Sequence, residues 1–285
     1  MEAKRNISVV YLIWLPAGTE SFYKFIYSYL HNIAGLSHQL IMLFKDSEID
    51  SKDTDPYHRY LEEMNIHYTS LYFKGGLDID AYFFAAKNIS KDLILFLNTN
   101  SILLSDNWLL KMYDNIIKEN VAMVAATGSF QSYSSTAFIR NSWQYERQKS
   151  FSHNFRKYKL FIKSFFYYKL FFKSFPNPHL RTNGFMIWKN IFLEIKYKPL
   201  TSKLRAYSFE SGRNSITNQI LKNNKNVLVV DKFGNKYEIN SWYDSKTFWS
   251  FNQENLLIAD NQTKKYLSAS ENKRRIYTLI AWGRK

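Results

Sequence analysis

Five consecutive apolar residues, Leu93–Leu97, constrain the fold more than any other feature of the sequence. A strand that is apolar on both faces belongs in the middle of a sheet that helices cover on each side. Strand and helix patterns alternate ahead of it: the strand-like runs are residues 8–14, 39–44 and 66–73, and the helix-like runs are 19–35, 57–64 and 79–88. This alternation predicts an α/β fold with a mostly parallel sheet flanked by helices.

The first strand-like run resembles a secretion signal in one respect, because Lys4 and Arg5 precede an apolar stretch from Ile7 to Leu15. The stretch is short and rich in β-branched and aromatic residues, and Pro16 follows it where a cleavage site would stand. These features favour a buried first strand over a signal, so we expect a cytoplasmic protein. No run reaches the roughly 20 apolar residues that a membrane-spanning helix needs.

The composition excludes several classes of chemistry. Cysteine is absent, so disulfide frameworks, thiolate zinc sites and cysteine nucleophiles are excluded. The six histidines lack metal-binding spacing, and the sequence contains no glycine-rich phosphate loop and no Gly-x-Ser-x-Gly motif. The chain has 39 lysines and arginines against 24 acidic residues, and this surplus favours a polyanionic partner: nucleic acid, an anionic membrane or a phosphorylated substrate.

The segment 151–175 concentrates this charge. Residues 156–173 include six basic residues and no acidic one, and aromatic residues fill the other side of the expected helix. In one interpretation the helix packs on the domain and its lysines are solvated. The functional alternatives are contact with an anionic membrane surface and binding of nucleic acid. Of these two we favour the membrane, and we do not expect nucleic acid as a partner.

The second half of the chain has weaker signals. We expect a strand at 185–188, a helix at 211–223, a strand at 226–231 and two helical stretches toward residue 285. No repeat or flexible linker divides the sequence. We therefore expect one catalytic domain, residues 1–240 with the segment 151–175 included, and a helical C-terminal extension, residues 241–285, packed on it.

The order of these parts resembles the GT-A fold glycosyltransferases, in particular the family 2 group. In that family a Pro-containing turn ends the first strand, as in Leu15-Pro16-Ala17-Gly18, and an acidic residue ends the second, as in Phe44-Lys45-Asp46. A Gly-x-x-x-Ala-x-Asn helix then precedes a hydrophobic strand. Ala86-Lys87-Asn88 fits the end of that helix pattern, whereas Tyr82 stands in place of its glycine.

Two segments of the second half extend the resemblance. Thr182-Asn183-Gly184 is similar to the family's small-residue turn near the acceptor, and Phe209-Glu210-Ser211 is similar to the segment that carries the catalytic base. Residues 209–217 and 253–263 also resemble a bacterial branch of glycosyltransferases. The resemblance covers about residues 7–231 and depends on the order of the parts, since no single motif in it is diagnostic.

The main departure from the family lies at its D-x-D motif, which holds a divalent cation and reads Asn98-Thr99-Asn100 in this chain. An asparagine oxygen is a weaker ligand for a hard cation than a carboxylate, so Asn98 and Asn100 would bind Mn²⁺ or Mg²⁺ weakly. Alternatively, the enzyme stabilises the leaving group with fixed cations, for which Arg181, Arg213 and Lys87 are available, or the domain has lost catalysis. We favour weak metal dependence or metal independence over lost catalysis.

The resemblance implies one catalytic residue, Glu210, as the base that removes the proton of the acceptor hydroxyl. It implies donor-nucleotide contacts at Pro16, Gly18, Asp46, Lys87, Asn98, Asn100 and Arg213, and acceptor or leaving-group contacts at Arg181, Asn183, Gly184 and Asp260. The acidic residues also have structural interpretations. Glu210 would suit a helix N-terminus, Asp46 a solvated acidic loop, and Asp260 the polar side of a helix.

From the resemblance we expect a glycosyltransferase that moves a sugar, with inversion, from a nucleotide-sugar donor to a glycan or lipid-linked acceptor in cell-surface polysaccharide synthesis. Such an enzyme would work in the cytoplasm, peripherally at the inner face of the cell membrane. The alternative is a non-catalytic protein of the same fold that binds anionic glycan or nucleic acid through its basic face.

Overall fold

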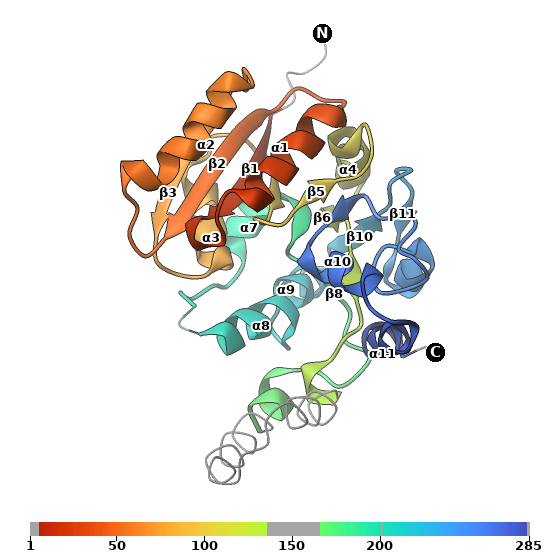
Figure 1. The fold of residues 1–285 in the computed structure, drawn as a ribbon. Helices are drawn as coiled ribbons and strands as arrows, with labels where there is room; N and C mark the ends of the chain where they lie inside the picture. Colours follow the sequence, from red (N-terminus) through yellow and green to blue (C-terminus); the bar gives the residue numbers. More distant parts are fainter. Residues whose placement is uncertain (1–5, 136–165, 201, 284–285) are drawn as a thin grey trace, which may run out of the picture.

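The computed structural model describes residues 6–135, 166–200 and 202–283 (Figure 1). These residues form an eight-stranded sheet in the order β11-β10-β6-β9-β4-β1-β2-β3. The strands are β1 (Ile7–Trp14), β2 (Gln39–Asp46), β3 (Thr69–Lys74), β4 (Leu93–Leu97), β6 (Val121–Ala125), β9 (Gly184–Trp188), β10 (Asn226–Val230) and β11 (Lys236–Tyr237). In this sheet β9 and β11 pair antiparallel with their neighbours, and every other pair is parallel. The predicted mostly parallel α/β sheet is confirmed.

The apolar strand β4 lies where the sequence predicts, in the middle of the sheet between β1 and β9. All five of its residues are buried, and every residue of β1 except Trp14 is buried as well. The run that begins at Ile7 is therefore a central strand, as expected.

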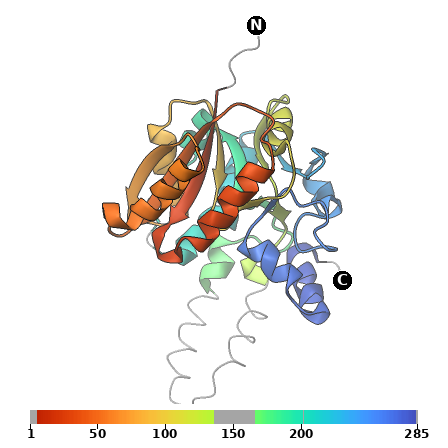
Figure 2. The same cartoon turned by 45° about the horizontal axis from the view of Figure 1, so that its top comes forward.

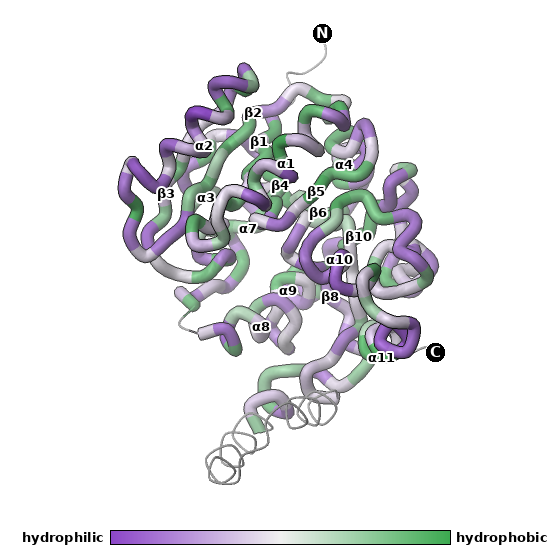
Figure 3. The backbone as a smooth tube through the Cα atoms, in the orientation of Figure 1, coloured by the Kyte–Doolittle hydropathy of each residue, from purple (hydrophilic) through white to green (hydrophobic). Residues whose placement is uncertain are grey.

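Helices cover both faces of the sheet (Figure 2). One face carries α1 (Glu20–His31), α2 (Ser51–Glu63) and α4 (Trp108–Ile116), and the other carries α3 (Asp78–Asn88), α7 (Lys189–Glu194), α8 (Lys203–Ser211) and α9 (Ile216–Lys222). Because side chains alternate along a strand, Val9 and Leu95 enter the first core, whereas Val10 and Phe96 enter the second. Figure 3 shows the result: the central strands are hydrophobic and the outer helices are mixed.

The C-terminal stretch completes the second core. After β11 come η3 (Ile239–Ser245), β12 (Ile258–Ala259), α10 (Asn261–Leu267) and α11 (Glu271–Trp282). Strand β12 pairs antiparallel with β5 (Ile102–Leu103). Trp242, Phe248 and Trp282 belong to the same hydrophobic cluster as Val10. The predicted helical C-terminal part is present, with the helices α10 and α11.

Two predicted elements differ from the structure. The helix expected at 211–223 is shorter and begins at Ile216, because Gly212 ends the preceding helix α8 and the Ser215 hydroxyl begins α9 by accepting a hydrogen bond from Asn218 N (3.3 Å). Glu210 therefore lies in the last turn of α8, so its interpretation as a carboxylate at a helix N-terminus is wrong. The acidic loop after Asp46 is also shorter than expected, because Asp50 caps α2 in a capping box.

The basic aromatic segment is described only in part, since residues 151–165 lie outside the described ranges. Residues 166–171 are helical, and Phe166 and Leu170 are each 67% exposed. Lys173 turns inward and donates to Asn218 Oδ1 at 2.6 Å, and desolvation lowers its pKa. Nowhere in the described ranges does a helix have the length and apolarity that crossing a membrane requires.

Candidate functional site

Several of the predicted site residues lie at the edge of the sheet where β4 ends and β9 begins. These strands run antiparallel, so Leu97 pairs with Gly184, and the turn after β4 meets the turn before β9. The backbone N–H of Asn98 donates to the carbonyl oxygen of Asn183 (3.4 Å), and the Ser101 hydroxyl donates to the same oxygen (3.1 Å). The two turns form one bonded unit at the carboxyl edge, where open α/β sheets bind their ligands.

The turn of residues 98–100 uses both of its asparagine side-chain oxygens. Asn98 Oδ1 accepts from the backbone N–H of Asn100 (3.0 Å) and from the Ser101 hydroxyl (3.2 Å). Asn100 Oδ1 accepts from the hydroxyl of Ser21, in the first turn of α1 (3.2 Å). Neutral oxygens that already accept hydrogen bonds fit a hard divalent cation poorly. Within the described ranges no group of three or more His, Asp or Glu side chains could hold a metal ion either.

Glu210 reaches this unit from α8. Its Oε1 accepts a hydrogen bond from the Thr182 hydroxyl at 2.7 Å. Desolvation raises the pKa of the Glu210 carboxyl above its ordinary value, and the charge of Asp78 adds to this rise. The bond from Thr182 and the positive charge of Arg181 act in the opposite direction without cancelling the rise. A desolvated carboxylate with a raised pKa is a stronger proton acceptor than an exposed one.

Arg181 and Asp260 form a buried ion pair beside Thr182. The Arg181 Nη2 atom lies 3.3 Å from Asp260 Oδ2, and the guanidinium stacks 4.2 Å from the centre of the Phe248 ring. Asp260 also caps α10, since its Oδ1 accepts from Thr263 N at 2.8 Å. The buried Nε of Arg181 has no hydrogen-bond partner among the described residues. One donor of this cation thus remains for an anionic group.

The structure brings together five of the predicted residues and Thr182, which the sequence analysis did not select. We call this set the inner cluster: Asn98, Arg181, Thr182, Asn183, Glu210 and Asp260. Gly184 stands at its boundary, where a Cβ atom would meet Ile258 at 3.4 Å. The members are buried or half-buried and bonded in three pairs, Asn98 with Asn183, Thr182 with Glu210 and Arg181 with Asp260. Such side chains need little rearrangement to act on a substrate.

The ends of β1 and β2 form a more open part of the same edge, which we call the outer rim: Trp14–Gly18, Lys45, Asp46 and Asp78. Pro16 and Gly18 are exposed in and just after the short turn η1 (Leu15–Ala17), and Gly18 has φ +71°, which favours glycine. Asp46 is half-buried and accepts from Ser47 N at 2.6 Å. Lys45, which the sequence analysis passed over, is buried and pairs with exposed Asp78 at 2.5 Å.

Two predicted donor contacts lie elsewhere. Lys87 is in the last turn of α3, and a helix advances about 13 Å over the nine residues from Asp78, so Lys87 lies toward the opposite edge of the sheet. Arg213 follows the end of α8 instead of continuing that helix. Its Nε donates to the Leu170 carbonyl (3.0 Å) and its Nη2 to that of Lys169 (3.4 Å), which satisfies the end of the helix at 166–171.

Two further side chains of the site had no strong signal in the sequence. Tyr82 replaces the family's glycine and packs 4.6 Å from Phe96, and its buried hydroxyl has no hydrogen-bond partner among the described residues. Burial raises its pKa well above the ordinary value, with contributions from Asp78 and Glu210. Lys264 of α10 approaches the Asn100 carbonyl (3.5 Å) although 163 residues separate them in sequence. No local pattern could have paired these two residues.

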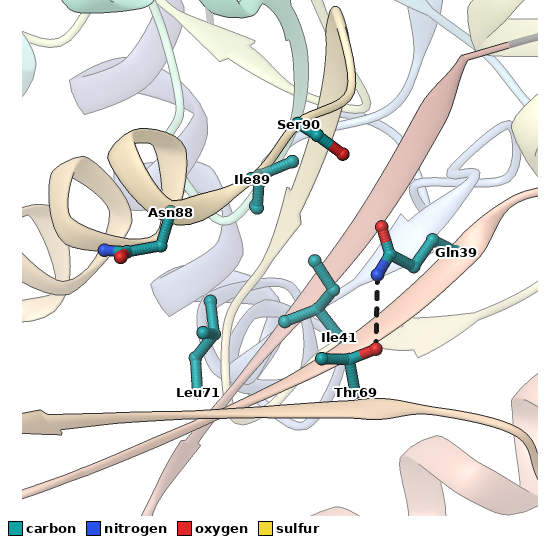
Figure 4. A pocket seen from close by; sticks show the side chains of 7 residues that line it. All are labelled: Gln39, Ile41, Thr69, Leu71, Asn88, Ile89 and Ser90. Carbon is teal, nitrogen blue, oxygen red and sulfur yellow. Dashed lines mark hydrogen bonds between the residues drawn. The ribbon is translucent and has the colours of Figure 1, made fainter.

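A small pocket lies at the opposite edge of the sheet (Figure 4). It is lined by Gln39, Ile41, Thr69, Leu71, Asn88, Ile89 and Ser90. Gln39 begins β2 and Asn88 ends α3, so this pocket lies at the amino ends of the parallel strands. No predicted site residue lines it.

No family model matches the chain, and no curated protein matches it in sequence. Among solved structures the chain is similar to the mannosyltransferase PcManGT from Pyrobaculum calidifontis, in complex with GDP-Man and Mn²⁺. The identity is 11% and the TM-score 0.34, over 44% of this chain and 36% of that one. It is also similar to residues 1–349 of TarS from S. aureus with UDP-GlcNAc, at 12% identity and TM-score 0.32, over 42% and 33%.

A third similarity spans nearly the whole chain. GalNAc-T7 with UDP, GalNAc and Mn²⁺ has 10% identity and TM-score 0.48, over 97% of this chain and 52% of that one. The chain therefore spans about a third to a half of the length of these three solved chains. The fold described above is defined by the strand order of this chain's own sheet and not by these similarities.

Proposed function

We propose that this chain transfers a sugar from a nucleotide-sugar donor to a hydroxyl group of a glycan or lipid-linked acceptor, with inversion, and that Glu210 is the base. The observation that carries the proposal is the desolvated Glu210 carboxyl, which Thr182 holds at the carboxyl edge next to the turn of residues 98–100. An inverting transfer needs one carboxylate that takes the acceptor proton as the hydroxyl oxygen attacks.

The donor nucleotide would lie along the outer rim. Pro16, Gly18 and Asp46 offer exposed backbone and one carboxylate for the nucleoside, and the turn of Asn98 and Asn100 lies between this rim and Glu210. Arg181 would face the reaction from the other side, where its free Nε–H can donate to a negatively charged oxygen.

A divalent metal is not part of the proposed mechanism. In the related D-x-D motif, Mn²⁺ or Mg²⁺ would neutralise the leaving diphosphate. The oxygens of Asn98 and Asn100 are uncharged and already accept hydrogen bonds, so they do not fit this role. Fixed positive side chains would have to supply the charge.

The acceptor would approach from the side of Asn183, Gly184 and Asp260. A membrane-borne acceptor suits the exposed apolar side chains of Phe166 and Leu170, which could rest at a headgroup boundary. Replacing both with serine should weaken co-sedimentation with phosphatidylglycerol vesicles. The matched control replaces exposed Tyr27 and Leu30 of α1 with serine. Equal binding of the two double variants would contradict the membrane-borne acceptor. It would not contradict the proposed sugar transfer.

The test of the activity is a panel of UDP-, GDP- and dTDP-sugars with and without EDTA. We expect release of nucleoside diphosphate from one donor, and we expect the release to persist in EDTA. Binding of anionic glycan or nucleic acid without any turnover would instead support the non-catalytic alternative. A folded protein that neither binds nor cleaves any donor would contradict the proposal.

A further inference from the structure

Lys264 brings a positive charge to the asparagine turn of residues 98–100. Its Nζ approaches the carbonyl oxygen of Asn100 at 3.5 Å from the middle of α10. The carbonyl belongs to the residue that stands at the second acidic position of a D-x-D motif. A positive charge is thus held where the sequence lacks the carboxylates that would hold a metal.

The charge of Lys264 is not neutralised by an ion pair. Among the described residues no acidic oxygen lies within 4.0 Å of its Nζ, whereas neighbouring Lys24 pairs with Glu20. Asp260 is already bonded to Arg181 and to the N-terminus of α10. Desolvation lowers the pKa of Lys264, and the charge of Lys24 lowers it further, whereas Asp260 and Glu20 act in the opposite direction. Because Glu20 pairs with Lys24 and not with Lys264, the Lys264 ammonium is the charge at this point that can attract an anion.

Asn100 is fixed from both sides. The Ser21 hydroxyl at the start of α1 holds its side chain, and the turn bond to Asn98 holds its backbone. The Lys264 ammonium therefore faces a rigid backbone carbonyl that also borders the inner cluster. A ligand oxygen placed beside this carbonyl would meet the ammonium directly.

We propose that Lys264 binds the diphosphate of the donor at the turn of residues 98–100 and stabilises it as the leaving group, in the absence of a metal. This inference rests on the proposed function. In the transfer, the bond from the anomeric carbon to the diphosphate oxygen breaks and its electron pair stays on that oxygen. The acceptor oxygen bonds to the anomeric carbon, and its proton passes to Glu210. Lys264 keeps its proton throughout and acts through its charge.

The test compares Lys264→Gln with Lys265→Gln. Lys265 is the adjacent exposed lysine on α10, and its Nζ lies 5.6 Å from the centre of the Tyr277 ring. Binding of UDP, GDP and the matching nucleoside monophosphates is measured by calorimetry in EDTA, so that only protein groups contribute. We expect Lys264→Gln to weaken diphosphate binding about ten- to a hundredfold, with little change for the monophosphate. Lys264→Arg should recover most of the loss, and Lys265→Gln should behave like the unaltered protein.

The outcomes separate this inference from the proposed function. If the unaltered protein binds a nucleoside diphosphate and the two glutamine variants bind it equally well, Lys264 has no role in the site and the proposed function stands. An equal loss of di- and monophosphate binding in Lys264→Gln indicates a structural role and also overturns the inference. If the unaltered protein binds no nucleoside diphosphate, the proposed function and the inference fall together.

Discussion

The outer rim and the inner cluster share one edge of the sheet but differ in how their side chains are held. Pro16, Gly18 and Asp78 of the rim are exposed, and the carboxylate of Asp46 is bonded only within its own turn. In the inner cluster, Glu210 of α8 and Asp260 at the start of α10 both bond to the segment before β9, to Thr182 and Arg181 respectively. The rim can adapt to a ligand, whereas the cluster is organised before one arrives. This contrast predicts that changes in the cluster cost much more than changes at the rim.

The largest effect is expected for Glu210→Gln. The amide keeps the shape of the side chain but cannot accept the acceptor proton, so turnover should fall about a hundred- to ten-thousandfold while nucleotide affinity is retained. In the unaltered protein, the pH at which turnover falls on the acid side should also be higher than for an ordinary glutamate base. A base works only when deprotonated, and desolvation raises the pKa of Glu210. Steady-state kinetics from pH 4 to 8 measure both.

The control for this variant is Glu254→Gln, an exposed carboxylate that pairs with Lys246. It should leave turnover unchanged. Near-normal turnover of a folded Glu210→Gln variant would remove Glu210 from the mechanism, and Asp260 would be the next carboxylate to test.

A comparable loss, in stability instead of rate, is expected for Asp260→Ala. The change leaves the half-buried Arg181 charge without its partner and removes the cap of α10, so the free energy of unfolding should fall by about 2–4 kcal/mol. The rim counterpart, Asp46→Ala, should cost less than about 1 kcal/mol. Urea denaturation measures both. Similar losses would show that the two parts of the edge are equally rigid.

The next effect is a dependence of stability on pH. His179 is buried next to the cluster, and burial lowers its pKa from 6.5 to about 4. The unfolded chain therefore binds a proton below pH 6.5 that the folded chain does not bind until about pH 4. Stability is present in full above pH 6.5, and about 3 kcal/mol of it should be lost as the pH falls to 4. Denaturation at several pH values should show this slope in the unaltered protein and a smaller one in His179→Gln.

The smallest effect is expected for Arg213→Ala. Since the guanidinium bonds to carbonyls at the end of the 166–171 helix, the variant should lose about 1 kcal/mol of stability or less and keep its nucleotide affinity. Arg205→Ala, at an exposed position of α8, serves as the control for the loss of charge. A tenfold loss of nucleotide affinity in Arg213→Ala alone would place this residue with the rim.

The sequence predicted the parts of the fold that follow from local pattern. The all-apolar run of β4, and the alternation before it, were sufficient for the parallel half of the sheet. The strand β9 was expected, but its antiparallel direction was not, because direction depends on pairing with β4 and β6. The helix α8 was not expected, and the start of α9 was placed too early, at Ser211 instead of Ile216. The direction of β9 brings residues 181–184 to the edge where β4 ends.

The sequence predicted those residues of the candidate site that lie at strand ends or in segments that resemble the family. Asp260 and Arg181 were selected separately, and only the structure pairs them. Lys87 lies in the last turn of α3, toward the opposite edge of the sheet, and Arg213, after the end of α8, bonds to the carbonyls of Lys169 and Leu170. Lys264 was missed because its approach to Asn100 depends on the packing of α10 against the turn.

The pairing of β12 with β5, and the place of Trp282 in the second core, bear on how the chain is made. A ribosome that has synthesised the protein only as far as β10 has already produced most of the sheet. Such a nascent chain lacks Trp242, Phe248 and Trp282, which complete the second core, and it lacks the Asp260 carboxylate that pairs with Arg181. The chain must therefore carry exposed apolar surface until α11 emerges. Chaperones that bind nascent apolar segments would have their longest access to this protein at that face.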